Sequence, residues 1–390
     1  MASIEPEILP EQTDDSADRG LARAFRAIVW AVVLSRTGVL VAGLIAVFAF
    51  GYDPPPNESA LWRVSTDPIA NLFARWDTFW YLDIATRGYS WNGNPLEQQN
   101  VVFFPLLPAL MRTLGAALGG HPLVAGLIVS LGSFVAAMVY LWKWTAGRFG
   151  AEVATDAVLL VCAFPFAVFF SVVYTESLFL LTVLGAWYHA ERREVVPAAI
   201  FGFLAGLVRP NGFLLAVPLA WIVATDPQRT VRARARQVAV VAAPIAAVVC
   251  HTLYLTHRVG DASAWIAAQA AWPTIAPWAP SDPRGHLPLD SWSVAIQVGN
   301  ALALLLAIAV IGPTARRLGA AAVLFVIVNL APPVIRHGLQ SLGRFTSILF
   351  PVFVALAATL PRRRLWIVVA CWAAGQIVAA MLFFTWRPVV

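Results

Sequence analysis

The sequence predicts an all-α, polytopic membrane protein. Of its 390 residues, 59% are hydrophobic and only 12% are charged, and the mean hydropathy is +0.73. Apolar runs of about 18 to 24 residues recur, the length that a helix rising about 1.5 Å per residue needs to cross roughly 30 Å of hydrocarbon. The three cysteines lie inside such runs, where a thiol behaves as a small hydrophobe, so we expect no disulfide and no cysteine metal site.

The net charge of +6 reflects orientation rather than binding to nucleic acid. The basic residues gather in short segments between the apolar runs, as the positive-inside rule requires of cytoplasmic loops. There is no P-loop and no strand-led glycine fingerprint for a nucleotide. The expected partners are therefore membrane lipids and lipid-borne molecules, and no nucleic acid.

The chain begins with an acidic stretch and then a first span. Residues 1–26 are poor in apolar residues, which predicts a disordered cytoplasmic tail, and they lack the basic start of a signal peptide. The apolar run 27–50 is too long for a signal sequence and predicts an uncleaved span. We expect residues 27–390 to form one membrane-embedded domain.

A large extracytoplasmic loop, residues 51–121, follows the first span. Its end, 103–118, is apolar but contains two prolines and Arg112. This pattern favours a helix on the membrane surface over a crossing, and the next span is then 122–142. The residues between the other spans then place most of the lysine and arginine on the inside.

The later spans bring the total to about eleven, with a second large outer loop at 257–291. They are expected at residues 152–170, 176–190, 197–208, 212–225, 237–256, 292–311, 319–335, 339–360 and 365–386. A rival interpretation makes 103–118 a span and fuses 197–225 into one. It places Lys143 and Arg148 on the extracytoplasmic side and Arg209 in the middle of the membrane. The positive-inside rule disfavours this placement. Our interpretation needs two short crossings that break around Arg209.

Acidic and aromatic residues of the first outer loop are the main candidates for chemistry. A helix closed by Gly88 places Asp77 and Tyr81 on one face and Asp83 about 120° away, so the two aspartates do not converge on one metal. Asp83 has an i,i+4 partner in Arg87. Asp77 has none, although Arg75 lies near in sequence, so Asp77 is the catalytic candidate and a surface cap or ion pair is its alternative.

Aromatic residues such as Trp76 and Tyr81 have two interpretations. Tryptophan and tyrosine gather at membrane interfaces, and they can also form a stacking platform for a sugar or a prenyl chain. In Tyr174-Thr175-Glu176-Ser177, Glu176 is either a first-turn acid favoured by the helix dipole or a second carboxylate that orients an acceptor hydroxyl or helps to hold a metal.

Arg209, Asn211 and Arg344 lie near outer helix ends among apolar residues. An ionisable group at such depth is costly and commonly functional. Because a guanidinium binds phosphate oxygens bidentately, a lipid phosphate is a plausible partner for the arginines, with snorkelling to headgroups as the alternative.

Five sequence blocks, in this order, resemble the PIG-V type mannosyltransferases, which add the second mannose to glycosylphosphatidylinositol anchors. The resemblance extends from about residue 70 to 215 and rests on Arg75-Trp76-Asp77, Ile84-Ala85-x-x-Gly88-Tyr89, Phe103-Phe104-Pro105-x-x-Pro108, Tyr174-x-Glu176-Ser177-Leu178-Phe179 and Arg209-x-Asn211-Gly212. Beyond it the C-terminal third is similar only in hydropathy.

The resemblance implies a GT-C fold, a polyprenyl-phosphate-linked mannose as donor, and a loop aspartate, here Asp77, as the base of an inverting transfer. We expect Asp77 and Glu176 to be catalytic and the following to bind substrate: Arg75, Trp76, Tyr81, Asp83, Tyr174, Arg209, Asn211 and Arg344. Some GT-C enzymes use a divalent cation such as Mg²⁺ or Mn²⁺; no metal ligand is assigned here.

The arginine-rich composition suggests a bacterial cytoplasmic membrane rather than the endoplasmic reticulum, and hence an acceptor other than a glycosylphosphatidylinositol, such as an inositol lipid, a lipoglycan or a secreted protein. Two other functions are open: a transporter or flippase of lipid-linked sugars, which predicts inverted repeats and midplane charges, and a non-catalytic subunit with the same fold.

Overall fold

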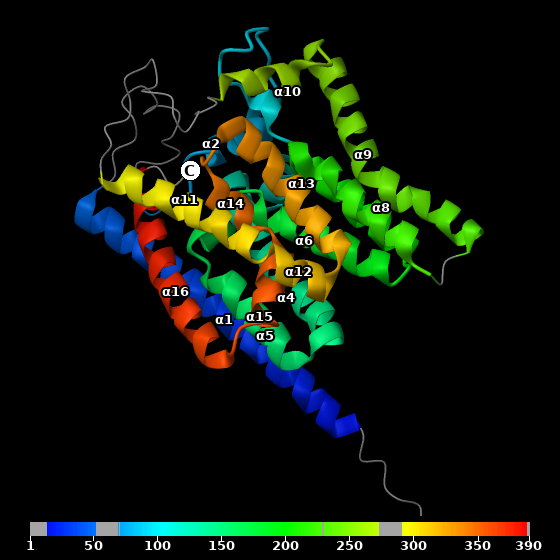
Figure 1. Ribbon diagram of the computed structural model, residues 1–390. Coiled ribbons are helices and arrows are strands. Elements are labelled where there is room, and N and C mark those ends of the chain that lie inside the picture. The colour runs from blue at the N-terminus through cyan, green and yellow to red at the C-terminus, as the bar shows by residue number, and fades with distance from the viewer. Residues whose placement is uncertain (1–13, 52–68, 70, 228–229, 273–290, 388–390) are drawn as a thin grey trace, which may run out of the picture.

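The computed structural model describes residues 14–51, 69, 71–227, 230–272 and 291–387. All the regular secondary structure within these residues is helical, and no strand occurs among them. The helices gather around α6 (Glu176–Glu191), whose residues are buried along most of its length. A helix that is apolar on every side is stable only where other helices surround it, and Figure 1 shows α6 at the centre of the molecule.

The first elements are a long span and three pieces of the outer loop. They are α1 (Asp14–Phe50), α2 (Thr78–Arg87), the 3₁₀ turn η1 (Asn100–Val102) and α3 (Leu106–Ala117). Residues 14–26 form the first turns of α1, which differs from the disordered tail expected through residue 26. Acidic residues such as Asp14 and Asp15 favour a helix N-terminus.

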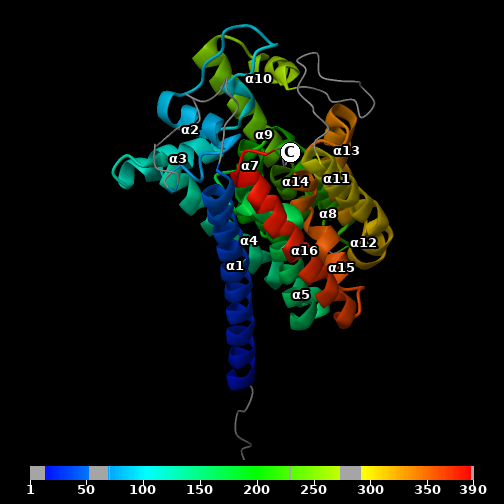
Figure 2. The ribbon, with the colours of Figure 1, turned by 90° about the vertical axis from the view of Figure 1, so that its left-hand side faces the viewer.

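The helix α3 has 12 residues, or about 18 Å, which is too short to cross the hydrocarbon core. Figure 2 shows it running across the direction of α1, near the end of the molecule that holds α2 and α10. Arg112 of α3 donates to the Ala85 carbonyl at 2.7 Å and the Ile84 carbonyl at 3.0 Å, and so ties α3 to α2. These features fit a surface helix.

The middle of the chain forms the helices around α6. They are α4 (Pro122–Phe149), α5 (Ala151–Ala163), η2 (Pro165–Ser171), α7 (Val195–Val208), η3 (Pro210–Leu215), α8 (Ala216–Thr225), α9 (Val231–Val259), α10 (Ala264–Ala267) and η4 (Ala268–Ala271). The break expected near Arg209 is present, since Arg209 is extended between α7 and η3. Residues 197–225 therefore do not form one continuous helix.

The last third contributes α11 (Ser291–Ala309), α12 (Ile311–Leu318), α13 (Ala320–His337), α14 (Leu342–Ser347), α15 (Phe350–Ala357) and α16 (Arg362–Phe384). The span expected at 339–360 is interrupted between α14 and α15. By length and composition, four described helices can cross a membrane, or up to six if two bent pairs each count as one span. The total of about eleven spans stays a prediction.

Arg36 supports a bend between α5 and η2. The span expected over 152–170 turns by 83° between α5 and η2, which frees backbone carbonyls. The buried Arg36 side chain of α1 donates to the carbonyls of Cys162, at 3.0 Å, and Ala167, and to the Ser171 hydroxyl at 2.8 Å. A charge inside the first span thus satisfies polar groups that lipid cannot.

The two ends of α6 have different surroundings. At its C-terminal end, Glu191 pairs with Arg148 at 2.7 Å, and Arg193 pairs with Asp226 at 2.8 Å. These residues belong to the turns expected in the cytoplasm. At the N-terminal end, Glu176 is next to the outer-loop elements. The structure therefore separates the basic turns from the Asp77 region by the length of α6.

Candidate functional site

The site begins at the turn before α2. Trp76 has a positive φ of 50°, which is strained for a bulky residue. Its ring lies 5.1 Å from that of Trp386. The Arg75 side chain is fully buried and donates to the Phe384 carbonyl at 3.1 Å and to the Asn71 carbonyl. Arg75 and Trp76 thus anchor the turn against the end of α16, and their predicted contact with substrate is not what the structure shows.

This turn presents Asp77 toward the centre of the molecule. The side chain of Asp77 does not cap α2; it accepts a hydrogen bond from Arg344 Nη1 through Oδ2 at 2.7 Å. Its backbone N–H donates to the Tyr174 hydroxyl at 3.1 Å, and the next residue, Thr78, donates to the Val173 carbonyl at 3.2 Å. Two contacts with the segment before α6 therefore hold the aspartate in place.

Glu176, the first residue of α6, is completely buried between two arginines. Its Oε1 accepts from Arg344 Nε and lies 3.2 Å from Arg209 Nη2. Its Oε2 has no hydrogen-bond partner among the described residues. A carboxylate at a helix N-terminus is favoured by the dipole, but this one needs the two guanidinium groups because an unpaired buried charge is costly.

Arg209 and Arg344 come from breaks in the helical framework, which place long side chains at the level of the α6 N-terminus. The Arg344 guanidinium carbon lies 4.6 Å from the Tyr174 ring centre, and that of Arg209 lies 5.3 Å from the Phe345 ring centre. Aromatic faces stabilise cations at such distances. Arg209 Nη1 is buried without a partner among the described residues, so one donor of this site is unused.

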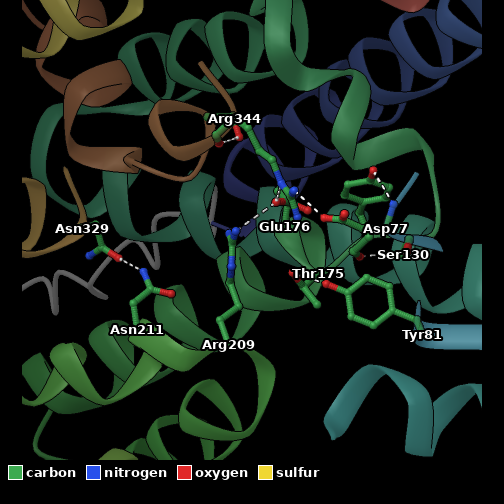
Figure 3. A network of polar contacts seen from close by, with 11 residues as sticks. Asp77, Tyr81, Ser130, Thr175, Glu176, Arg209, Asn211, Asn329 and Arg344 are labelled. Atoms are coloured by element: carbon green, nitrogen blue, oxygen red, sulfur yellow. Dashed lines mark hydrogen bonds and ion pairs between the residues drawn. The ribbon is translucent and has the colours of Figure 1, made fainter. Parts of the chain in front are cut away.

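These groups surround a cavity of about 170 Å³. Asp77, Arg209 and Arg344 line it, and their side chains point toward one another in Figure 3. The other lining residues include Tyr81, Thr175 and the aromatic side chains of Phe103, Trp272 and Phe345. Glu176 is not among the residues that line this cavity; its carboxylate contacts Arg209 and Arg344.

Tyr81 is one of the neutral polar residues that line the cavity. Its hydroxyl is 3.5 Å from Thr175 Oγ1. Burial, and secondly the nearby Asp77 carboxylate, raise the pKa of Tyr81 well above its usual value. The phenol therefore stays protonated and can donate a hydrogen bond to a ligand.

Two predicted residues lie away from the cavity. Asp83 accepts from Asn100 at 2.7 Å and pairs with Arg87 at 3.4 Å, which confirms the i,i+4 pair. Asn211 donates to the Asn329 side chain at 3.0 Å, on the far side of Arg209 in Figure 3. Both side chains have structural partners, so the expected contact of Asp83 and Asn211 with substrate is not supported.

The carboxylates of the site do not form a metal-binding group. No cluster of three or more histidine, cysteine or acidic side chains occurs within the described part of the chain. Asp77 and Glu176 share Arg344 as counter-ion, and a cation placed between them would face two guanidinium groups. The donor set favours an anion.

Trp272 and Phe345 are site residues that sequence reasoning missed. Trp272 belongs to the segment 257–291 that was predicted to be the second outer loop, and it packs edge-on against Phe103 at 5.8 Å. Phe345 follows Arg344 on α14. Neither residue lies in a distinctive sequence pattern, and only the fold brings both of them close to Asp77. The motif Phe103-Phe104 was the one sequence signal for an aromatic wall of the cavity.

Comparison with known proteins identifies a family for this chain. The model of the family described as Mannosyltransferase (PIG-V) matches residues 57–255. No curated protein sequence matches the chain. Among solved structures, the crystal structure of the Archaeoglobus fulgidus oligosaccharyltransferase in complex with Zn and sulfate aligns with a TM-score of 0.45 and 16% identity. The alignment covers 90% of this chain and 53% of the archaeal one, so this chain spans about half the length of that protein.

The family match covers more than half of the 390 residues. It includes Asp77, Glu176 and Arg209, and it ends before Arg344. The chain belongs to the PIG-V mannosyltransferase family of membrane glycosyltransferases.

Proposed function

We propose that this protein transfers a mannosyl residue from a polyprenyl-phosphate-linked donor to an acceptor hydroxyl, with Asp77 as the general base. The observation that carries the proposal is one cavity in which a carboxylate faces two arginines. The Asp77 side chain is 26% exposed, whereas Glu176 is fully buried. Asp77 is therefore the carboxylate that a ligand can reach.

The reaction is a single inverting displacement. The acceptor oxygen forms a bond to the anomeric carbon while the bond from that carbon to the phosphate oxygen breaks. The acceptor proton moves to Asp77, and the polyprenyl phosphate leaves with the electron pair. Asp77 Oδ2 is held by Arg344, so Oδ1 is the oxygen that accepts the proton. A positioned base contributes about 10²- to 10⁴-fold to such a step.

The arginines stabilise the leaving group. Negative charge grows on the phosphate as the bond breaks, and preorganised donors aimed at that charge lower the barrier. Arg344 lines the cavity, and Arg209 offers the unused Nη1. At about 170 Å³, the cavity is smaller than typical ligand pockets of about 300–1,000 Å³. It suits the sugar and phosphate, while the prenyl chain stays in the lipid.

Glu176 is a positioning residue in this mechanism. It bonds to both arginines and lines no part of the cavity. Its negative charge holds the two guanidinium groups close to Asp77. It also offsets the repulsion between the two guanidinium groups before the phosphate enters. The proposed steps are assigned to these side chains, and a divalent cation that accompanies the phosphate is left open.

The acceptor is proposed to be lipid-borne or secreted and to react on the extracytoplasmic side. The support is the separation of Asp77 from the basic turns at the other end of α6, combined with the positive-inside rule. A transporter or a non-catalytic subunit is the competing function. An exposed carboxylate with a paired arginine in a cavity is expected of a catalyst and has no evident purpose in a subunit.

The test is transfer of radiolabelled mannose from polyprenyl-phosphate mannose in membranes that contain the unmutated chain or Asp77→Asn. We expect Asp77→Asn to lower the transfer rate by at least about 10²-fold. Asp83→Asn, in the helix that follows Asp77, is the matched control and retains transfer. Undiminished transfer by Asp77→Asn refutes the assignment of the base. No transfer by the unmutated chain to any lipid or protein acceptor favours the transporter or the subunit.

A further inference from the structure

A second, larger cavity lies between α2, α3, α7 and α9. It is a groove of about 570 Å³. Phe104 separates it from the Asp77 cavity, since Phe104 lines that cavity and its ring centre is 4.5 Å from the ring of His251 in the groove. The proposed reaction assigns no part to this groove.

The groove is basic at one end and apolar along its length. Arg87, Arg112 and Arg258 line it together with Phe203, Leu207 and Cys250, and no acidic residue belongs to the lining within the described chain. Eight residues separate Cys250 from Arg258 on α9, or about 12 Å along the helix. Apolar side chains of α9 next to the groove, such as Leu253, are exposed on the outside. This is the polarity of a phospholipid, with a headgroup end and a chain end.

Two polar side chains of the groove have no partner within the described residues. Arg258 makes no hydrogen bond or ion pair there. His251 is 2% exposed, and neither of its ring nitrogens is hydrogen-bonded. Arg258 is exposed and can be solvated by water, whereas His251 is buried. Buried polar atoms are nearly always satisfied, because leaving one without a partner costs free energy. The groove is thus built for a ligand that carries polar atoms and negative charge.

We infer that this groove binds an anionic glycerophospholipid of the surrounding bilayer. Its phosphate lies between Arg258 and Arg112, its ester oxygens lie further along α9 toward His251, and its acyl chains follow the apolar surface of α7 and α9. Guanidinium groups bind phosphate oxygens strongly, and each basic side chain near an anionic membrane surface adds to the affinity.

The bound lipid stabilises α2, the helix that directly follows Asp77. Arg112 donates to two carbonyls in the last turn of α2. Arg258 lies over its C-terminal end, with Nη2 3.7 Å from the place of a β-carbon on Gly88. A phosphate that joins these arginines ties α2 to α3 and α9, and Asp77 precedes the first residue of α2. This effect on catalysis rests on the proposed function, whereas the binding does not.

To test the binding, the protein is placed in nanodiscs of phosphatidylglycerol or of phosphatidylcholine. It is then released from them, and the lipids that stay bound are counted by native mass spectrometry. We expect retention of phosphatidylglycerol over phosphatidylcholine. Arg258→Gln, which removes no contact within the described chain, should retain phosphatidylglycerol about fivefold less. Arg363→Gln is the control, because Arg363 is an exposed arginine near the start of α16 and should change nothing.

Equal retention of the two lipids, or equal retention by Arg258→Gln and the unmutated chain, overturns the inference. Retention of polyprenyl phosphate in preference to phosphatidylglycerol also overturns it, because the groove is then part of the donor site. In the activity arm, phosphatidylglycerol should raise mannosyl transfer by the unmutated chain and have less effect on Arg258→Gln. If the unmutated chain transfers no mannose, the proposed function fails while the retention experiment still decides on the lipid site.

Discussion

Arg344 of α14 donates a hydrogen bond of 2.7 Å to Asp77, although 267 residues separate the two in sequence. The same guanidinium donates through Nε to Glu176. A planar guanidinium presents its N–H groups in a rigid fork, so one side chain orients the exposed carboxylate of the cavity and the buried one behind it. The pairing joins the C-terminal third of the chain, where the family match is absent, to the first outer loop.

Arg344→Lys should therefore lower transfer although it keeps the positive charge. An ammonium group is a point donor and cannot occupy the positions of Nε and Nη1 at once. Loss of one preorganised donor to developing charge costs about 10²- to 10³-fold in kcat. Steady-state kinetics with the lipid-linked donor would measure this; a variant with unchanged kcat and only a raised KM would contradict a role in the reaction step.

Glu176→Gln should destabilise the protein. The change leaves two buried guanidinium groups with only Asp77 as a counter-ion, and breaking a buried ion pair costs about 3–5 kcal/mol. Glu152→Gln is the control: Glu152 pairs with Arg362, but its side chain is 66% exposed, and such surface pairs contribute about 0–1 kcal/mol. Unfolding in detergent would compare them. Equal midpoints for the two variants would show that Glu176 does not stabilise the site.

Gly212→Ala should loosen the break that positions Arg209. A β-carbon at this residue would lie 2.1 Å from the Ala205 carbonyl oxygen, and backbone cannot move aside as a flexible side chain can. Overpacking of this kind costs about 1–3 kcal/mol. Gly132→Ala provides the comparison, because a β-carbon there meets nothing within 4 Å. We expect a lower unfolding midpoint and slower transfer for Gly212→Ala alone; unchanged behaviour would mean that α7 and η3 are not in tight contact.

Arg36→Met should be destabilising even though it replaces a charge in a span by an apolar side chain. The Ala167 carbonyl and the Ser171 hydroxyl lose their donor, and each buried polar group left unsatisfied costs about 1–3 kcal/mol. The exposed Arg364, replaced in the same way, should leave the unfolding midpoint within about 0.5 kcal/mol of the original value. An increase in stability for Arg36→Met would show that the bend between α5 and η2 needs no such donor.

Part of this site was accessible from the sequence, because its signals are local. The apolar runs identified the membrane class, the residues around Arg209 predicted a broken helix, and the i,i+4 spacing assigned Asp83 to Arg87. The blocks around Asp77 and Glu176 also agreed with the family. The same patterns did not reveal that Arg75 and Trp76 contact the end of α16, since a motif does not show which of its side chains face which helix.

Arg36 and Trp272 were missed for a related reason. Arg36 lies in an apolar run and looks like one charge tolerated in a span; its purpose appears only where α5 bends. Trp272 carries no pattern of its own, and it becomes part of a cavity wall through contact with Phe103.

The sequence by itself determined that this is an all-α membrane protein of the PIG-V mannosyltransferase family with Asp77 as its leading carboxylate. Hydropathy and helical periodicity depend on residues within a few turns of one another, so both can be evaluated without knowledge of the fold. The tertiary structure decided that Asp77 pairs with Arg344, that Glu176 is buried behind the arginines, and that a second, basic groove adjoins the site. Contacts between residues far apart in sequence arise when helices pack, and the free energy of burying each charge then depends on which partners that packing supplies.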